Sequence, residues 1–280
     1  MDTVAIAGVG LLGGSLAMAL RRAGFEGTIL GASRTPKALP TEFTRSVTLE
    51  EAAPVSDVLV LCAPVLAVIS DLERLDAMVR PGTLITDVGS TKRRIMEAAR
   101  AHIRKAVFLG GHPMAGKQVG GVENAAVDLF DERTWFLVRT VDPDPPAARE
   151  FVEWIARIGA VPHYIDEIAH DRSVAFTSHL PQLMSTALAA TLAASLGSDD
   201  ARARSGKGLR DMLRLAQSDF GMWRDILETN ADFIGEALMS FSSFVQRFKD
   251  FPLHRLRGEL DGAEDVFSQA TEFTAKFNKG

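Results

Sequence analysis

The sequence has a single cysteine among 280 residues and no excess of basic side chains. A lone cysteine excludes an internal disulfide and a cysteine-rich metal site, and we expect no bound metal. That cysteine, Cys62, ends the apolar run at residues 58–62, a setting typical of a buried structural thiol. The formal net charge of −5 at pH 7 gives no reason to expect a nucleic-acid partner, because such proteins present a basic surface.

The chain also lacks an apolar run long enough to cross a bilayer. Residues 180–197 are nearly uncharged, but Pro181, Gln182 and several hydroxyl side chains interrupt them, so we predict a buried helix there. The first residues already read as a strand, and we therefore expect no signal peptide. Together these absences predict a cytoplasmic protein without a membrane partner.

The first half of the chain alternates short apolar runs with amphipathic stretches. We expect strands at residues 4–8, 28–32, 57–63, 82–88, 106–110 and 135–139. We expect helices at residues 11–23, 65–79, 91–103 and 147–158. Apolar strands without polar alternation, separated by helices, are typical of a parallel sheet that is covered on both faces. The pattern predicts an α/β, doubly wound, Rossmann-type N-terminal domain at residues 1–166.

The second half becomes helical after an apolar segment at residues 161–165. We expect helices at residues 166–196, 207–217, 220–248 and 254–277. The third of these carries a broad apolar stripe at helical spacing, formed by Phe233, Ile234, Ala237, Leu238, Phe241, Phe244, Val245 and Phe248. Such a stripe packs within its own domain or against a second subunit, and the two readings are compatible. We therefore predict an all-α C-terminal dimerisation domain at residues 167–280 and a homodimer formed through its helices.

A glycine-rich turn, GVGLLG at residues 8–13, follows the first strand and opens the first helix. Gly8 permits the tight turn, Gly10 lets the backbone approach a pyrophosphate, and Gly13 allows close packing of helix on strand. The helix N-terminus stabilises the negative charge of such a ligand. The turn predicts a dinucleotide site, to which we also assign Leu11, Leu12, Ala63 and Pro64.

The residues after the second strand bear on the choice between NAD and NADP. NAD sites usually carry an acidic residue there, which binds the ribose 2′-hydroxyl. This sequence has Ser33, Arg34 and Thr35 instead. The two hydroxyl groups can donate hydrogen bonds to a phosphate, and Arg34 can pair with it or stack over it. The pattern favours NADP, with NAD as the second cofactor and a solvated surface arginine as the alternative reading.

The segment GGHPMAG at residues 110–116 follows a strand at the expected carboxyl edge of the sheet. Open α/β folds bind their ligands at this edge. His112 stands between glycines and a proline, where it is well placed to accept a hydrogen bond from a substrate hydroxyl. A lone histidine is more often structural, but this position predicts a catalytic one.

Together with four further segments, GGHPMAG resembles the prephenate/arogenate dehydrogenase (TyrA) family of tyrosine biosynthesis. The four segments are DVGSTK at 87–92, SHLP at 178–181, GLRDMLRLA at 208–216 and SDFGMWRD at 218–225. The resemblance spans roughly residues 3–250. It implies an NAD(P)-dependent oxidative decarboxylation of a small molecule, in which a cyclohexadienyl ring passes hydride to the nicotinamide and loses CO₂. By this resemblance His112 accepts the hydrogen bond of the ring hydroxyl, and Ser90 orients that hydroxyl and the histidine.

The resemblance also implies substrate-binding residues in the helical half. Arg214 corresponds to the family arginine that binds the ring carboxylate, and Arg210, one helical turn earlier, supports it. His179 corresponds to a histidine near the substrate side chain, and Trp223 to a residue near the entrance. From the residues alone, a solvated helix face and a core histidine are the open alternatives.

Two positions depart from the family pattern. Leu213 replaces a hydroxyl residue that is common just before the arginine, and Lys117 stands where threonine or serine is frequent. Lys117 and Gln118 are then expected beside the substrate side chain, which leaves the choice between prephenate and arogenate open. The remaining length suggests no appended regulatory domain.

Two other functions fit parts of the pattern. A β-hydroxyacid or imine reductase has a related two-domain architecture, but it does not account for GGHPMAG with the downstream arginines. A non-catalytic NADP-sensing protein would use its helical half to bind partners, and it predicts that replacing His112 leaves function intact.

Overall fold

The structure is a computed structural model that describes residues 1–33, 39–117, 119–142, 144–249 and 261–278. Three predicted site residues, Arg34, Thr35 and Gln118, lie outside these ranges. The chain forms two compact units, Met1–Ala231 and Asp232–Gly280, and each is described by itself. The functional division expected between residues 166 and 167 is a different boundary, and it stays a prediction.

The first unit contains a sheet of eight strands among the described residues, in the order β3-β2-β1-β4-β5-β6-β7-β8. The strands are β1 Thr3–Ala7, β2 Thr28–Ala32, β3 Arg45–Val47, β4 Val58–Leu61, β5 Leu84–Asp87, β6 Val107–Pro113, β7 Thr134–Arg139 and β8 Val161–Tyr164. The first six are parallel and follow the 3-2-1-4-5-6 order of doubly wound dinucleotide-binding sheets. This confirms the predicted fold class.

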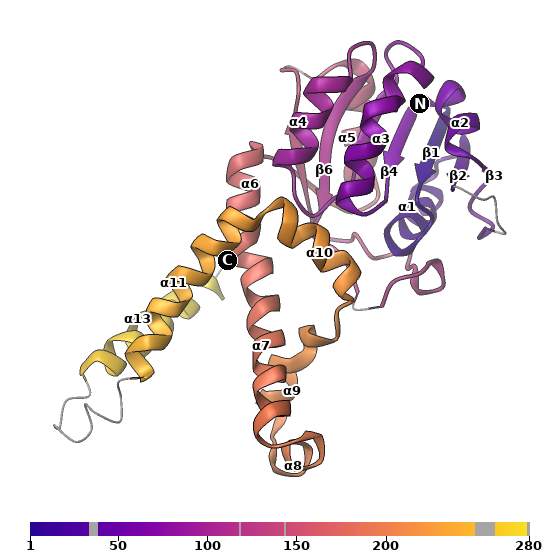
Figure 1. Ribbon diagram of the computed structural model, residues 1–280. Coiled ribbons are helices and arrows are strands. Elements are labelled where there is room, and N and C mark those ends of the chain that lie inside the picture. The colour runs from indigo at the N-terminus through magenta and orange to yellow at the C-terminus, as the bar shows by residue number, and fades with distance from the viewer. Residues whose placement is uncertain (34–38, 118, 143, 250–260, 279–280) are drawn as a thin grey trace. The chain divides into compact units, whose positions relative to one another are not determined.

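Helices cover both faces of this sheet (Figure 1). They are α1 Leu11–Arg22, α2 Leu49–Ala52, α3 Val65–Met78, α4 Arg93–His102 and α5 Pro146–Arg157. Val4 and Ile6 of β1 join one core with Leu16 and Phe151, from α1 and α5. Ala5 and Ala7 point the other way, into a second core with residues of α3 and α4 that include Val68, Leu72 and Ile95. Because both faces of the strand are buried, the apolar runs show no polar alternation.

Three features of the sheet differ from the sequence-based expectation or add to it. The short strand β3 and helix α2 were not predicted; α2 begins at a capping box in which Thr48 and Glu51 bond each other's backbone N–H. β7 runs antiparallel to β6, because the described residues of the 114–133 connection form a loop with one 3₁₀ turn and no crossover helix. β8 then pairs parallel to β7.

After Tyr164, every regular element of the described residues is a helix. In the first unit these are α6 Glu167–Val174, a π turn at Ala175–His179, α7 Leu180–Ser195, α8 Ser198–Arg204, α9 Lys207–Leu213, a 3₁₀ turn at Arg214–Gln217 and α10 Phe220–Thr229. The helix expected at 166–196 is thus interrupted by a π turn. The helix expected at 220–248 is interrupted at Asn230, which adopts φ −133° and ends α10.

The second unit contains α11 Ala231–Lys249, apart from its first residue, and α13 Asp261–Phe277. The two helices contact each other through the Arg247–Asp265 ion pair of 2.8 Å and the Phe248–Phe267 ring contact. Large apolar side chains remain exposed on both helices, and they include Met239, Phe241, Phe244, Phe267, Phe273 and Phe277. No helix of the described residues is long and apolar enough to span a membrane.

Candidate active site

The glycine-rich turn lies between β1 and α1, as predicted. Gly8 has a left-handed φ of 104°, and a Cβ there would overlap the carbonyl of Cys62. A Cβ on Gly13 would overlap the carbonyl of Gly8. Gly10 differs, because its backbone is extended and a Cβ would meet no atom of the described residues within 4 Å, its chain neighbours apart. The fold does not require a glycine at residue 10, and this open approach to the backbone fits the place of a pyrophosphate.

Other predicted cofactor residues lie at the same edge of the sheet. They are the first two residues of α1, the residue after β2 and the β4–α3 connection: Leu11, Leu12, Ser33, Ala63 and Pro64. Because β2, β1 and β4 are adjacent parallel strands, their carboxyl ends meet at this edge. The first N–H groups of α1 have no partner within the helix, so they can serve an anionic ligand.

A buried ion pair joins the carboxyl ends of β5 and β6. Asp87 and Lys92 are both fully buried, and they pair with each other. Asp87 Oδ1 accepts the Gly111 N–H at 3.0 Å, and Lys92 Nζ donates to the Gly111 carbonyl at 2.7 Å. A Cβ on Gly111 would overlap the Asp87 carbonyl, which explains the glycine before His112. The pair therefore fixes the backbone that presents His112.

His112 begins a chain of hydrogen bonds that ends at a helix. Its Nδ1 lies 2.9 Å from Nε2 of His170, and Nδ1 of His170 lies 2.8 Å from Oδ1 of Asp171. Asp171 accepts the backbone N–H groups of Lys92 and Arg93 at 2.6 and 2.9 Å, which caps the N-terminus of α4. His112 is only 9% exposed, and His170 and Asp171 are fully buried.

Burial controls the protonation of the histidines in this region. It lowers the pKa of His112 well below its ordinary value of 6.5, and His170, Lys92 and His179 lower it further. Burial also lowers the pKa of His170, although Asp171 opposes this shift. Burial lowers the pKa of His179 to about 4. All three rings are therefore neutral near pH 7, and His112 can act as a hydrogen-bond acceptor.

His179 lies close to this chain, at the end of the π turn. The side-chain nitrogen of Asn230 donates to the Asp171 carbonyl at 2.8 Å and lies 3.3 Å from Nδ1 of His179. Because a carbonyl can only accept, the nitrogen of Asn230 must face it, and Nδ1 of His179 then accepts as well. His179 therefore carries its proton on Nε2. Trp223 stacks edge-on against His179, with ring centroids 5.7 Å apart, and its buried indole N–H has no hydrogen-bond partner among the described residues.

The two predicted arginines lie on a segment that α7 holds. Gln182 and Ser185 of α7 donate hydrogen bonds to the carbonyls of Leu215 and Met212 at 2.7 and 2.6 Å. The side chains of Arg210 and Arg214 are exposed, and within the described part of the chain no hydrogen bond or ion pair joins either to His112. The structure thus brings together His112 and His179, and it leaves the side chains of the two arginines exposed on the segment that α7 holds.

Ser90 and Lys117 take separate positions. Ser90 follows β5 and lies two residues before Lys92, at the same edge as His112. Lys117 donates to the Asn124 carbonyl of its own loop at 2.7 Å, so its ammonium is held by the β6–β7 connection.

A second carboxylate ties the helical segment to the sheet edge. Asp225 of α10 is buried, and its Oδ2 accepts the N–H of Leu66 in the first turn of α3 at 3.1 Å. The helices after residue 166 thus provide caps for α4 and for α3, both of which begin at the carboxyl edge. Trp223, two residues before Asp225, is positioned by the same contact.

Five residues of this site carried no assigned role in the sequence-based prediction: Asp87, Lys92, His170, Asp171 and Asn230. Two of them stand in the DVGSTK segment, where only Ser90 was assigned. The adjoining His170-Asp171 pair stands near the start of the helix predicted at residues 166–196, and a histidine and a carboxylate need partners when they are buried. Asn230 gave no signal apart from its poor fit to a helix interior.

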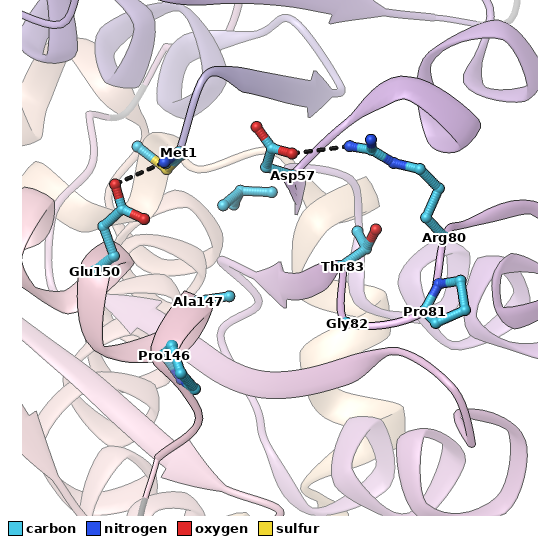
Figure 2. Close-up of a pocket in the computed structure, with 10 residues that line it drawn as sticks. Met1, Asp57, Arg80, Pro81, Gly82, Thr83, Pro146, Ala147 and Glu150 are labelled. Atoms are coloured by element: carbon cyan, nitrogen blue, oxygen red, sulfur yellow. Dashed lines mark hydrogen bonds and ion pairs between the residues drawn. The ribbon is translucent and has the colours of Figure 1, made fainter.

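A cavity of about 390 Å³ lies at the opposite, amino edge of the sheet (Figure 2). Its charged groups pair with each other, as Asp57 with Arg80 and the Met1 amino group with Glu150. It lies away from every residue that the sequence analysis assigned. Among the described residues, no group of three or more His, Cys, Asp or Glu side chains is arranged to hold a metal ion.

Comparison with known proteins covers both halves of the chain. A family model described as prephenate dehydrogenase, nucleotide-binding domain, matches residues 16–164. A second, described as prephenate dehydrogenase, dimerization domain, matches residues 166–253. A probable prephenate dehydrogenase of Streptomyces niveus is 31% identical over 269 residues, which cover 94% of this chain and 71% of the relative. The prephenate dehydrogenase of Lactococcus lactis is 30% identical over 259 residues, which cover 88% and 70%.

A solved structure agrees over nearly the whole length. It is that of the prephenate dehydrogenase from A. aeolicus in complex with hydroxyphenyl propionate and NAD⁺, with a TM-score of 0.84 and 27% sequence identity. The match covers 98% of each chain.

Proposed function

Because this chain belongs to the prephenate dehydrogenase family, we propose that it oxidatively decarboxylates prephenate or arogenate, as a nicotinamide-dependent enzyme of tyrosine biosynthesis. The observation that carries the proposal is His112, a buried neutral histidine at the same sheet edge as the glycine-rich turn. The reductase and cofactor-sensing alternatives are not favoured, because matches to prephenate dehydrogenase models cover both halves of the chain.

His112 acts on the hydroxyl group of the substrate. When bound, the nicotinamide accepts the hydride that leaves the ring carbon bearing this hydroxyl. Nε2 of His112 accepts the hydroxyl hydrogen bond, which raises electron density on the oxygen and eases hydride departure. The bond between the ring and its carboxylate carbon breaks, and its electron pair enters the ring as CO₂ leaves. The ring thereby becomes aromatic. Ser90 orients the hydroxyl.

Cations and donors bind the two acidic groups of the substrate. Arg214, supported by Arg210, pairs with the ring carboxylate, since an exposed guanidinium can form two parallel bonds to it. The Nε2–H of His179 and the unpaired indole N–H of Trp223 are donors for the substrate side chain. Lys117 and Gln118 contribute to the choice between the keto and amino side chains.

The cofactor proposed is NADP. Its support is Ser33-Arg34-Thr35, which follows β2 without an acidic residue. A relative of known structure binds NAD⁺, so the two cofactors must be compared directly. We expect a higher kcat/KM with NADP⁺, and a selective rise in KM for NADP⁺ in Arg34→Ala. A wild-type preference for NAD⁺ contradicts this choice.

A homodimer through the C-terminal helices is proposed as well. Its support is the dimerization-domain match at residues 166–253 and the exposed apolar side chains of α11 and α13. Sedimentation should give twice the mass of the chain, and Phe244→Glu should lower it while the exposed neighbour Ser243→Glu does not. We retain residues 1–166 and 167–280 as the functional domains, and the cytoplasmic location stays a prediction.

One assay tests the activity. The protein is mixed with prephenate or arogenate and with NAD⁺ or NADP⁺, and the absorbance of the reduced nicotinamide is followed. We expect turnover in at least one mixture, and turnover slower on the order of 10²–10⁴-fold in the matched His112→Asn protein. If wild-type protein is inactive in all of the mixtures, the proposed activity is wrong.

A further inference from the structure

We propose that His170 and Asp171 are positioning residues that hold His112 in the tautomer with its proton on Nδ1. This leaves Nε2 of His112 unprotonated and able to accept the substrate hydroxyl. The inference rests on the proposed role of His112, and it assigns a task to two residues that no sequence motif marked.

The order of donors and acceptors starts at Asp171. Its two oxygens accept the backbone N–H groups of Lys92 and Arg93, both of which can only donate. The positive end of the α4 dipole further favours an acceptor carboxylate at this place. Asp171 is held a second time through its own carbonyl, which accepts from Asn230 at 2.8 Å. Asp171 therefore offers His170 only a lone pair.

The lone pair of Asp171 then determines which nitrogen donates in each of the two neutral rings. His170 must donate from Nδ1 to Asp171, and a neutral imidazole has only one N–H. Its Nε2 is thus an acceptor, 2.9 Å from Nδ1 of His112. His112 must donate across this contact, so its own single proton is on Nδ1. The reverse order would require Asp171 to donate, and the two backbone N–H groups that its oxygens already accept oppose a proton there.

The surroundings of His112 keep both rings neutral. The two rings are buried. Among the described residues, the charged or titratable groups that act on them are Lys92, directly before α4, Asp87 of β5, His179 of the π turn and Asp171 itself. The ammonium of Lys92 opposes a second proton on either ring, and Asp87 is already paired with that ammonium. Proton position, and not net charge, is therefore the variable that Asp171 and His170 control.

Two substitutions of His170 separate this role from simple packing. In His170→Gln the side-chain carbonyl reaches about as far as Nε2 and can accept the His112 proton. In His170→Asn the amide replaces only Nδ1 and leaves His112 Nδ1 without its acceptor. We expect kcat of the Asn variant to fall on the order of 10²–10⁴-fold with KM changed less than about threefold, and the Gln variant to recover most of kcat. His102→Asn, at an exposed position on α4, is the matched control.

A second readout needs no turnover. In ¹⁵N-histidine-labelled protein, the NMR chemical shifts of the ring nitrogens distinguish Nδ1–H from Nε2–H. Each signal is assigned by its loss in a variant that lacks one histidine. We expect His112 and His170 in the Nδ1–H form and His179 in the Nε2–H form. In His170→Asn, His112 should shift toward the Nε2–H form.

These outcomes separate the inference from the proposed function. Wild-type His112 in the Nε2–H form overturns the inference even if the enzyme is active. Equal kcat for the Asn and Gln variants in folded protein does the same. Failure of every substrate and cofactor mixture overturns the proposed activity instead, and it leaves the measured tautomers standing. If His170→Asn does not fold, the wild-type spectrum decides.

Discussion

At the carboxyl edge of the sheet Asp87 and Lys92 pair with both side chains fully buried, whereas at the amino edge Asp57 and Arg80 pair with side chains that are 38% and 53% exposed. The two ion pairs lie on the same sheet, and Asp57 and Asp87 flank opposite ends of neighbouring strands. At the amino edge, water can replace either partner. At the carboxyl edge each polar atom needs a fixed protein partner, so the network there holds a single geometry.

The same contrast appears in the acid–base behaviour of the two edges. Burial opposes ionisation of Asp57, but the N–H groups of Asp2 and Thr3, together with Arg80, outweigh it and lower its pKa. At the carboxyl edge burial dominates, and it lowers the pKa of His112, His170 and His179. The edge that excludes water is therefore the one whose groups are prepared for proton chemistry.

The largest effect is expected from His112→Asn. Asparagine cannot accept the substrate hydroxyl proton as imidazole does, so kcat should fall on the order of 10²–10⁴-fold. KM should change little, because the groups proposed to bind the carboxylate remain. Steady-state kinetics with the best substrate and cofactor pair measures both. If the variant keeps more than a tenth of wild-type kcat, His112 is not the catalytic hydrogen-bond acceptor.

Breaking the buried pair should cost most in stability. Lys92→Met leaves Asp87 buried without its counter-charge, and we expect the free energy of unfolding to fall by about 3–5 kcal/mol. Urea denaturation followed by circular dichroism measures this. The double variant Asp87→Asn, Lys92→Met should lose less, since no buried charge is left unpaired. A single variant as stable as wild type would show that the pair is dispensable.

Acid should destabilise the protein through the buried histidines. In the unfolded chain a histidine binds its proton near pH 6.5, whereas His179 in the folded state does so near pH 4. The unfolded state therefore binds more protons as the pH falls below 6.5, and the free energy of unfolding decreases. Between pH 6.5 and pH 5 this amounts to about 2 kcal/mol for His179. Urea midpoints at several pH values test this, with His179→Gln expected to flatten the dependence.

The smallest effect is expected at the amino edge. Arg80→Met removes the exposed partner of Asp57, whose carboxylate keeps its two backbone donors and its contact with water. We expect a loss of at most about 1 kcal/mol in unfolding free energy and unchanged kcat. A loss as large as that of Lys92→Met would mean that burial does not distinguish the two edges.

The sequence predicted the parts of the fold that local patterns determine. Gly8 and Gly13 stand where the backbone leaves no space for a Cβ, and the buried strands appear as uninterrupted apolar runs. It did not predict β3, which has only three residues. The sequence-based helix at residues 220–248 also ran through Asn230, where α10 ends.

The candidate site was predictable only in part, for a related reason. His112 stands among glycines and a proline that mark a special backbone, and this context is local. Asp171 and Lys92 are ordinary charged residues in the sequence, and their roles depend on their partners. Asp171 bonds Lys92, 79 residues away, and Lys92 pairs with Asp87, 5 residues away. Such pairing is a property of the folded chain, and single-sequence patterns do not contain it.

The π turn at Ala175–His179 has a consequence for insertions and deletions. In an uninterrupted α-helix, nine residues make about two and a half turns, which would put His170 and His179 on opposite faces. The wider turn between them changes this phase, and Asn230 contacts both the Asp171 carbonyl and His179. Removing one residue from the segment would rotate every later side chain of α7 by about 100°. The length of this segment is therefore as much a part of the site as the identity of its histidines.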